Sequence, residues 1–505
     1  MNEEIEEYYE ELYRLCIDEN QPLERRYRQL RESLERVVRE KIQGNSLQTT
    51  DLAARINYVA TQYGLDLKEQ NQLHTFRLTS NDILNHRKSP VKEEFLRDLR
   101  AVAYAYRKMF AQDIPLKLFS VLPKQEIASS GKKEKMEYIR RIRVCFDYAD
   151  DTYLYVHPVD VIADEPIRVV YNKPGINHEF EETIKELWRY AQLNLLDVSV
   201  DRDGIYTPSF IVLEPDYLID ISSLAECYKD YGSHPANYFL SRLVPIDNAR
   251  PLLLGNIANL FLDEWIHAGE EEPDYIDCMK KAFRQYPIEL AACAELRDPS
   301  KEKEFAKDCR MHFEHIRDVV QHTFLEPGYN LDKKEAVLEP SYICEALGIQ
   351  GRLDYMQRDM SSFIEMKSGK ADEFSMQGKV EPKENNKVQM LLYMAVLEYS
   401  MGQDRRRMHP YLLYTRYPLL YPARASWAQV RRVINLRNRI VAAEYGVQFH
   451  NHPDFTRNLL AQINPEVVNE RKLSGRFWEQ YLKPSISRFR EKLSALEPLE
   501  QAYFY

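Results

Sequence analysis

The chain has 505 residues, of which 44% are hydrophobic and 29% charged, and its 69 basic and 79 acidic residues give a net charge of −10. This composition excludes a disordered chain, and the absence of any run of 18 apolar residues excludes a membrane-spanning helix. The first twenty residues carry eight acids and one base, unlike a signal peptide, and the seven cysteines show no CxxC spacing. We therefore expect a cytoplasmic protein of about three domains without a membrane partner.

Helices are predicted from the N-terminus to about residue 118. Apolar residues recur at spacings of three and four from Leu23 to Val38 and again from Phe95 to Phe110. This is the period of a helix that buries one face. We expect a helical bundle over residues 1–118, and the sequence assigns it no chemistry.

A β-rich module is predicted over residues 119–213. A lysine-rich stretch at 129–135 precedes two alternating runs, RIRVCFDY and TYLYVHPVDVI, which are separated by a turn at 149–151. Alternating branched and aromatic residues on both sides of a turn are typical of a β-hairpin. No function is assigned to this module.

Helices and strands alternate in the third predicted domain, residues 214–425. Helices are expected at 251–267 and 385–400, a charged helical stretch extends to 324, and strands are expected within 350–367 and at 410–414. Residues 426–505 form a predicted C-terminal helical extension. The predicted fold class is therefore α/β, in the form of an α+β multidomain protein.

Two acidic residues and one lysine carry the candidate chemistry. Glu365 and Lys367 are two residues apart in a strand-like run, so their side chains lie on one face. If Asp359-Met360 is a hairpin loop, Asp354 lies opposite Glu365. Two facing carboxylates destabilise a sheet unless a cation lies between them. Because only two oxygen ligands come from side chains, water and phosphate complete the shell, as is usual for Mg²⁺.

Lys367 adds a positive charge on the same face as Glu365. Beside a metal ion it stabilises the negative charge that develops when water attacks a phosphodiester. These three residues therefore predict hydrolytic nuclease chemistry. The alternative interpretation of the same spacing is an exposed hairpin with an ordinary cross-strand ion pair.

Three short motifs follow one another in this part of the chain. They are Gly348-x-x-Gly351-x-x-Asp354, Glu365-x-Lys367-x-Gly369-Lys370 and Gln389-x-x-x-Tyr393. In this order they resemble the RecB-type branch of the PD-(D/E)xK nuclease superfamily, over about residues 216–420. Within that branch, they are most similar to the nuclease domain of the eukaryotic DNA-replication helicase-nuclease.

The resemblance implies a restriction-endonuclease-like core, in which helices flank a mixed sheet. It also implies a metal-dependent deoxyribonuclease that acts on single-stranded ends or flaps of DNA. Asp354 and Glu365 would bind Mg²⁺ or Mn²⁺, and Lys367 would be catalytic. Gln389 and Tyr393 would support the site.

The chain departs from this family in two ways. Where the family usually has a metal-binding histidine, in a helix after a glycine, this chain has Asn259 after Gly255. An amide oxygen binds a metal ion more weakly than a histidine does, and Asp263, one turn later on the same helix, would add a second ligand. The alternative is that Asn259 and Asp263 belong to a solvated helix face.

The second departure concerns cysteines. Relatives with an iron–sulfur cluster use one early and three late cysteines, whereas here Cys227 falls near the first position and no cysteine follows Cys344. We expect no iron–sulfur cluster.

A basic window lies between residues 401 and 440. Nine arginines and one acid give it a local charge of +8, and tyrosines are interleaved with the arginines. Such a pattern engages both phosphates and unstacked bases. The alternative is a solvated helix face next to a tyrosine-rich core strand. The residues predicted to contact nucleic acid are Lys370, Arg352, Arg405, Arg406, Arg407 and Arg416.

Three further expectations concern partners. Relatives carry a helicase motor after the nuclease, but this chain has no phosphate-binding loop, so we expect any helicase in a longer form of the protein or an associated chain. A catalytically weak or inactive nuclease-fold scaffold that binds nucleic acid is the alternative to an active enzyme. A third interpretation is that residues 1–118 recruit a partner in a repair or phage-defence complex.

Overall fold

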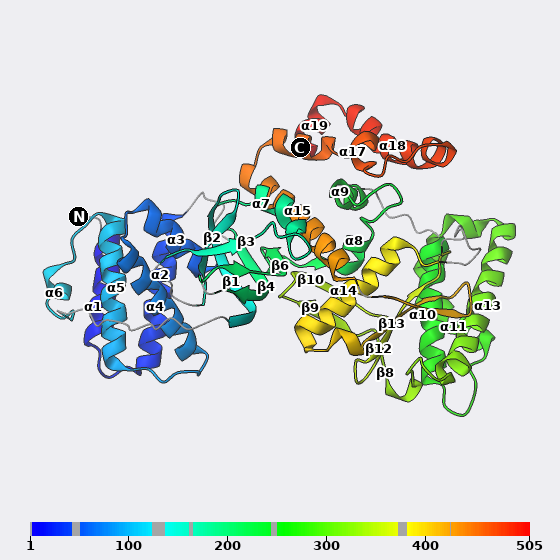
Figure 1. The fold of residues 1–505 in the computed structure, drawn as a ribbon, viewed down its shortest axis with the longest axis horizontal. Helices are drawn as coiled ribbons and strands as arrows, with labels where there is room; N and C mark the ends of the chain where they lie inside the picture. The colour runs from blue at the N-terminus through cyan, green and yellow to red at the C-terminus, as the bar shows by residue number, and fades with distance from the viewer. Residues whose placement is uncertain are drawn as a thin grey trace. The chain divides into compact units, whose positions relative to one another are not determined.

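The computed structural model describes residues 3–42, 51–123, 137–160, 165–201, 203–243, 250–371, 381–424 and 426–505 (Figure 1). The chain forms two compact units, residues 1–214 with 448–450, and residues 215–447 with 451–505. It is 56% helical and 16% strand, which confirms the α/β multidomain class. The predicted division at 213–214 lies at the boundary between the units, whereas those at 118–119 and 425–426 lie inside a unit. The stretch at 129–135 lies outside the described residues.

The first unit begins with helices that share one core. These are α1 (Glu3–Ile17), α2 (Leu23–Lys41), α3 (Leu52–Gln62), α4 (Leu67–Leu84), α5 (Lys92–Phe110) and the short α6 (Leu116–Phe119). Asp51 and Asp66 cap the starts of α3 and α4 by accepting backbone N–H groups. Cys145 and Tyr190 of the following β-rich region belong to the same hydrophobic core. The helices and the β-rich region are therefore packed together.

The β-rich region is a small closed barrel. Its strands are β1 (Glu137–Ala149), β2 (Tyr153–Pro158), β3 (Ile167–Val170), β4 (Gln192–Val200), β5 (Tyr206–Thr207) and β6 (Phe210–Leu213). The strand order is β1-β2-β3-β5-β4-β6, and β1 also pairs with β4, so the sheet closes on itself. The predicted hairpin is confirmed as β1 and β2, and α7 (Glu181–Lys185) follows β3.

Two sheets form the centre of the second unit. One has the order β7 (Ile219–Asp220), β10 (Ile349–Arg352), β9 (Ser341–Cys344). The other has the order β14 (Leu419–Pro422), β13 (His409–Tyr414), β12 (Ser362–Lys367), β11 (Tyr355–Gln357), β8 (Ala336–Leu338). In the second sheet β12 and β13 are parallel. The chain passes from β10 into β11 through Leu353 and Asp354, so Asp354 connects the two sheets.

Helices cover both faces of the five-stranded sheet. α10 (Arg250–His267) and α13 (Pro299–Gln321) share a hydrophobic core with Ile364, Met366 and Leu413 of the sheet. α14 (Glu384–Met401) contacts β13, β9 and the short α8 (Ile221–Ala225). Because side chains alternate along β12, Glu365 lies on the face opposite Ile364 and Met366.

The remaining α-helices of the second unit are α9 (Ala236–Leu243), α11 (Tyr275–Gln285), α12 (Pro287–Ala292), α15 (Trp427–His450, without its last three residues), α16 (Pro453–Ala461), α17 (Pro465–Val468), α18 (Lys483–Ser494) and α19 (Pro498–Phe504). α15 begins close to the start of the predicted C-terminal extension, and helices follow it to the last residues. Among the described helices, none has the length and apolarity needed to cross a membrane.

Candidate functional site

The β11–β12 hairpin has the register that the sequence predicts. Tyr355 pairs with Ile364, and Met356 pairs with Phe363. One step further along the same register, Asp354 is opposite Glu365. The two candidate metal ligands therefore come from neighbouring segments of one hairpin.

The loop of this hairpin is longer than the predicted two residues. β11 ends at Gln357 and β12 begins at Ser362, so residues 358–361 form the connection. The amide of Met360 donates to Gln357 O at 2.8 Å, and Met360 adopts a left-handed φ of 60°. The prediction of a loop limited to Asp359-Met360 is therefore wrong. The turn over residues 357–360 ends at the left-handed Met360, and this longer connection keeps the predicted register of the two strands.

Asp354 is held against β12 by a backbone hydrogen bond. Its Oδ2 accepts from Met366 N at 2.6 Å, next to Glu365 in the chain. Burial raises the pKa of both carboxyl groups, and the charge of Asp354 raises the pKa of Glu365 further. The two acids therefore act on each other inside a buried site, where one proton or one cation relieves their repulsion.

Glu365 Oε1 receives two donors. Lys367 Nζ lies 2.9 Å from it and Gln389 Nε2 lies 2.6 Å from it. Gln389 Nε2 is also 3.1 Å from Ser222 Oγ, which links α14 to α8. Burial lowers the pKa of Lys367, but the facing carboxylates of Glu365 and Asp354 raise it more, so the ammonium stays charged.

The second oxygen of Glu365 has no such donor. Oε2 is buried and has no hydrogen-bond partner among the described residues. A buried, unsatisfied carboxylate oxygen is costly, and a divalent cation is a partner that removes the cost. The residues at this position therefore fit Mg²⁺ or Mn²⁺, which Asp354 and Glu365 would hold.

In the part of the chain that the structure describes, this pair does not belong to a larger cluster of ligands. Within the described ranges, no three His, Cys, Asp or Glu side chains come together closely enough to hold a metal ion. With Asp354 and Glu365 as the carboxylate ligands, water, phosphate or backbone oxygens would complete the shell of the cation. Mg²⁺ is commonly bound in this way.

The first glycine of the Gly348-x-x-Gly351-x-x-Asp354 motif makes room for a buried arginine. Gly348 has a left-handed φ of 64°, and a Cβ there would collide with the guanidinium of Arg437. Arg437 is fully buried and donates to Gly348 O at 3.2 Å and to Tyr217 O. Arg437 therefore has a structural role, which its position in the basic window of the sequence does not reveal.

The second glycine of the motif makes room for Tyr393. A Cβ on Gly351 would lie 3.1 Å from Tyr393 Oη and 3.0 Å from Ile221 Cδ1. Tyr393 Oη donates to Arg352 O at 2.6 Å. Tyr393 thus holds the strand that leads directly to Asp354, and we describe it as a positioning residue.

Helix α10 borders the carboxylates. A Cβ on Gly255 would lie 3.3 Å from Ser368 Oγ, so α10 passes close to the end of β12. Two turns later, burial and nearby acids raise the pKa of Asp263 to about 6, and Asp354 is one of those acids. Asn259 is partly buried and lies between these two positions on the same helix face.

Glu339 is a site residue that the sequence does not indicate. Its amide donates to Asp354 O at 3.1 Å, and its Oε2 accepts from Arg352 Nη1 at 3.1 Å. Its charge also raises the pKa of Asp263. No motif marks Glu339, because only the pairing of β8 with β11 brings it next to Asp354.

The predicted nucleic-acid contacts are divided between the two ends of β12. Because β12 and β13 are parallel, residues that precede β13 lie where β12 begins, and residues that follow β13 lie where β12 ends. Arg416 follows β13 and therefore lies at the end that carries Lys367. The residues that precede β13 are Arg405, Arg406 and Arg407, which lie at the other end.

Three of these six cations pair with acidic side chains. Arg405 lies 4.5 Å above the Trp427 ring and 3.5 Å from Glu398, and Arg406 pairs with Asp404 at 2.9 Å. Arg352 is exposed and pairs with Glu339, and Lys370 is exposed just after β12. Of the six predicted residues, Lys370, Arg352 and Arg416 are the ones that lie at the end of β12 that carries the carboxylates.

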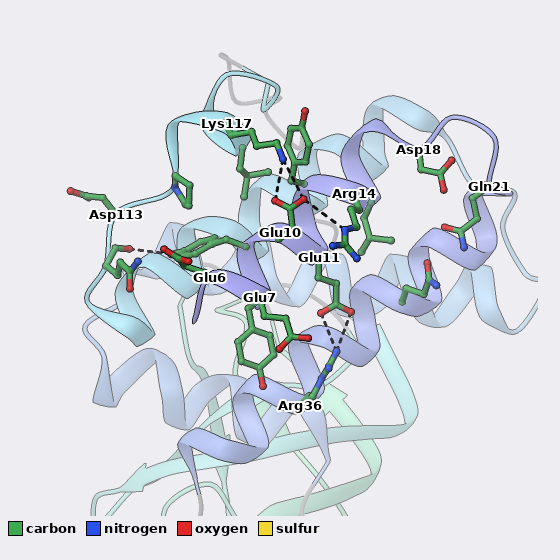
Figure 2. A pocket seen from close by; sticks show the side chains of 18 residues that line it. Glu6, Glu7, Glu10, Glu11, Arg14, Asp18, Gln21, Arg36, Asp113 and Lys117 are labelled. Carbon is green, nitrogen blue, oxygen red and sulfur yellow. Dashed lines mark hydrogen bonds and ion pairs between the residues drawn. The ribbon is translucent and has the colours of Figure 1, made fainter. Parts of the chain in front are cut away.

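A pocket of about 1140 Å³ lies elsewhere, in the helical part of the first unit (Figure 2). Glu6, Glu7, Glu10 and Glu11 of α1 line it. Glu10 pairs with Lys117 at 3.2 Å and Glu11 with Arg36 at 3.0 Å, which neutralises only part of the lining. Since this acidic surface repels phosphate, the hairpin site is the better candidate for nucleic-acid chemistry.

No protein-family model matches this chain, and no curated protein is significantly similar to it. The resemblance noted in the motifs therefore has no support from relatives. A function has to be argued from the residues of the site themselves.

Proposed function

We propose that this chain is a Mg²⁺- or Mn²⁺-dependent deoxyribonuclease that hydrolyses phosphodiester bonds at single-stranded ends or flaps. The observation that carries the proposal is the buried Oε2 of Glu365, which has no hydrogen-bond partner among the described residues and lies across the hairpin from the half-buried carboxylate of Asp354. A charged ammonium, that of Lys367, lies 2.9 Å from the other oxygen of Glu365. Two carboxylate ligands and the ammonium group of Lys367, all within one hairpin, suit metal-assisted hydrolysis.

The reaction is the attack of water on phosphorus, which breaks one P–O ester bond and leaves a phosphomonoester and a hydroxyl. A bound divalent cation supplies charge neutralisation at the phosphate and acidifies water. Lys367 stabilises the negative charge that develops on the phosphate oxygens. Gln389 holds Glu365 through Oε1, so that Oε2 remains available to the cation.

The surrounding charges are consistent with this assignment. Asp263 and Glu339 add negative charge next to Asp354, which favours the binding of a cation. Because the chain has a net charge of −10, it repels DNA as a whole, and positively charged side chains near the site have to attract the phosphates. Arg416 and Lys370, at the end of β12, are the cations that support this.

The test is cleavage of 5′- and 3′-labelled single-stranded and flap DNA in the presence of Mn²⁺. We expect Asp354→Asn and Lys367→Met each to lower the cleavage rate by about 100-fold or more. Lys387→Met removes a partly exposed lysine of α14 that pairs with Glu381, and it should retain the wild-type rate. Equal cleavage by all four proteins would eliminate the assignment.

A non-cleaving scaffold is the second candidate, and one residue favours it. Asn259 stands where the resemblance implies a metal-binding histidine. This candidate predicts DNA binding that weakens as salt rises, survives Asp354→Asn and yields no metal-dependent products. Such a protein would hold nucleic acid within a repair or phage-defence complex.

A further inference from the structure

The barrel of the first unit has the strand order of an oligonucleotide-binding fold. β1 pairs with both β2 and β4, β3 pairs with β5 in parallel, and the helix α7 lies between β3 and β4 in the chain. In this architecture the outer face of the second and third strands, with the adjoining loops, is the usual ligand surface. Topology alone does not assign a function, so the side chains of that face have to indicate whether it binds a ligand and of which kind.

Aromatic side chains gather on this face. Tyr148 of β1 stacks on Tyr155 of β2, with ring centroids 4.3 Å apart and planes at 12°. Tyr153, two residues before Tyr155, contacts it edge-on. Tyr148 is 51% exposed, while Leu154 and Val156, which alternate with the β2 tyrosines, fill the barrel interior. These tyrosines are therefore not core residues.

A cation belongs to the same surface. Arg168 of β3 pairs directly with Tyr155 in the strand register, and its guanidinium lies 5.7 Å from the centre of the Tyr153 ring. It also donates to the backbone oxygen of Asp203 at 3.3 Å. We call Tyr148, Tyr153, Tyr155 and Arg168 the tyrosine platform.

The platform is held in place by the β1–β2 loop. Asp150 accepts from the amides of Thr152 and Tyr153 at 2.8 and 2.7 Å and from the hydroxyl of Tyr155 at 2.9 Å. The hydroxyl of Tyr171 donates to Asp150 O at 2.8 Å. The Tyr155 ring is thus oriented before any ligand arrives, which lowers the entropic cost of binding. The three donors also offset the charge of Asp150 next to the platform.

From this arrangement we infer that the tyrosine platform binds single-stranded nucleic acid by base stacking. Rings on a strand face stack on bases only when those bases are unpaired, and a nearby arginine engages the phosphate backbone. An oligosaccharide also stacks on aromatic rings, but it carries no phosphate to use Arg168. This inference concerns the first unit and does not depend on the proposed nuclease activity.

The experiment measures binding of a fluorescein-labelled oligothymidine by the full chain in EDTA, with Asp354→Asn present in every protein to prevent cleavage. We expect Tyr148→Ala and Arg168→Ala each to weaken binding about tenfold, which matches the loss of one stacked base or one cation contact. Tyr148→Phe, which keeps the ring, should bind as the parent does. The matched control is Tyr138→Ala, on the same strand, because Tyr138 is 64% exposed but bonds to Asp197 outside the platform.

Photo-crosslinking with 5-iododeoxyuridine in the oligonucleotide separates this surface from the hairpin site. Crosslinks at Tyr148, Tyr153 or Tyr155 support the inference. Unchanged binding by both Tyr148→Ala and Arg168→Ala, or crosslinks confined to residues 215–505, would overturn it. Equal affinity for a neutral oligosaccharide or for blunt duplex DNA would also overturn it.

Discussion

The side chain of Tyr393 fills the space next to Gly351, and its hydroxyl donates to the carbonyl oxygen of Arg352 at 2.6 Å. This relationship joins α14 to β10, the strand that leads to Asp354. Gln389, one turn earlier on α14, holds Glu365. One helix therefore positions both candidate metal ligands, which gives the Gln389-x-x-x-Tyr393 spacing a physical reason.

We expect Gly351→Ala to lower cleavage by about tenfold or more while the protein still folds. A Cβ 3.0 to 3.1 Å from Ile221 and Tyr393 forces both side chains to move, at a cost of about 1–3 kcal/mol. Small displacements of positioned groups have large effects on rates. The measurement is the cleavage rate, compared with Gly369→Ala, because a Cβ on Gly369 meets nothing within 4 Å. Equal rates for the two variants would contradict this role of Tyr393.

We expect Gly348→Ala to be much more destabilising than Gly402→Ala. Both glycines have left-handed φ values, 64° and 71°, so each substitution carries a backbone strain of about 1–2 kcal/mol. At Gly402 the added Cβ meets open space, whereas at Gly348 it collides with the buried guanidinium of Arg437. Displacing a buried charged group from its hydrogen bonds adds about 3 kcal/mol or more.

The measurement for this pair is chemical denaturation followed by tryptophan fluorescence. The open space at Gly402 makes that variant the control for backbone strain alone. If both variants lost the same free energy of unfolding, the fit of Arg437 against Gly348 would not contribute to stability.

We expect a half-buried histidine, His74, to make the first unit sensitive to acid. His74 Nε2 lies 2.7 Å from Asn57 Oδ1, and His74 Nδ1 accepts from Arg77 Nε at 3.4 Å, so the ring is neutral. Burial, with the charge of Arg77, lowers the pKa of His74 to about 3. The unfolded chain binds this proton near pH 6.5, so the stabilisation is complete above that pH and decreases as the pH falls toward 3. At pH 5 the loss is about 2 kcal/mol.

The check is the melting temperature at pH 7.5 and pH 5.0. We expect His74→Gln, which keeps a donor for Asn57 but does not titrate, to lose less stability at pH 5.0 than the wild type does. His86→Asn removes an exposed histidine from a left-handed position that asparagine tolerates, and it should behave as the wild type. An equal acid shift in all three proteins would exclude His74 as the cause.

Sequence patterns predicted the local parts of this structure and missed the long-range ones. The register of Asp354 against Glu365 was predictable, because a short loop and a two-residue period determine it. The closure of β1 on β4 was not predicted, since its partners are about fifty residues apart. Arg437 and Glu339 were missed for the same reason, because their neighbours are brought together by tertiary packing and not by a motif.

Helix α10 provides the last prediction. Asn259 lies one turn from Gly255, which is packed against Ser368, and one turn from Asp263, whose pKa is raised in part by Asp354. An imidazole is a stronger ligand than an amide oxygen, so we expect Asn259→His to tighten Mn²⁺ binding by about tenfold.

Isothermal titration with Mn²⁺ measures this gain directly, and cleavage at limiting Mn²⁺ should rise in parallel. The control is a double-mutant cycle with Asp354→Asn, because a histidine that shares a cation with Asp354 gains little once that carboxylate is gone. An equal gain in both backgrounds would mean that the histidine binds Mn²⁺ at a separate position. No gain in either background would mean that residue 259 does not face the cation, and the pairing of α10 with the β11–β12 hairpin as one metal centre would be wrong.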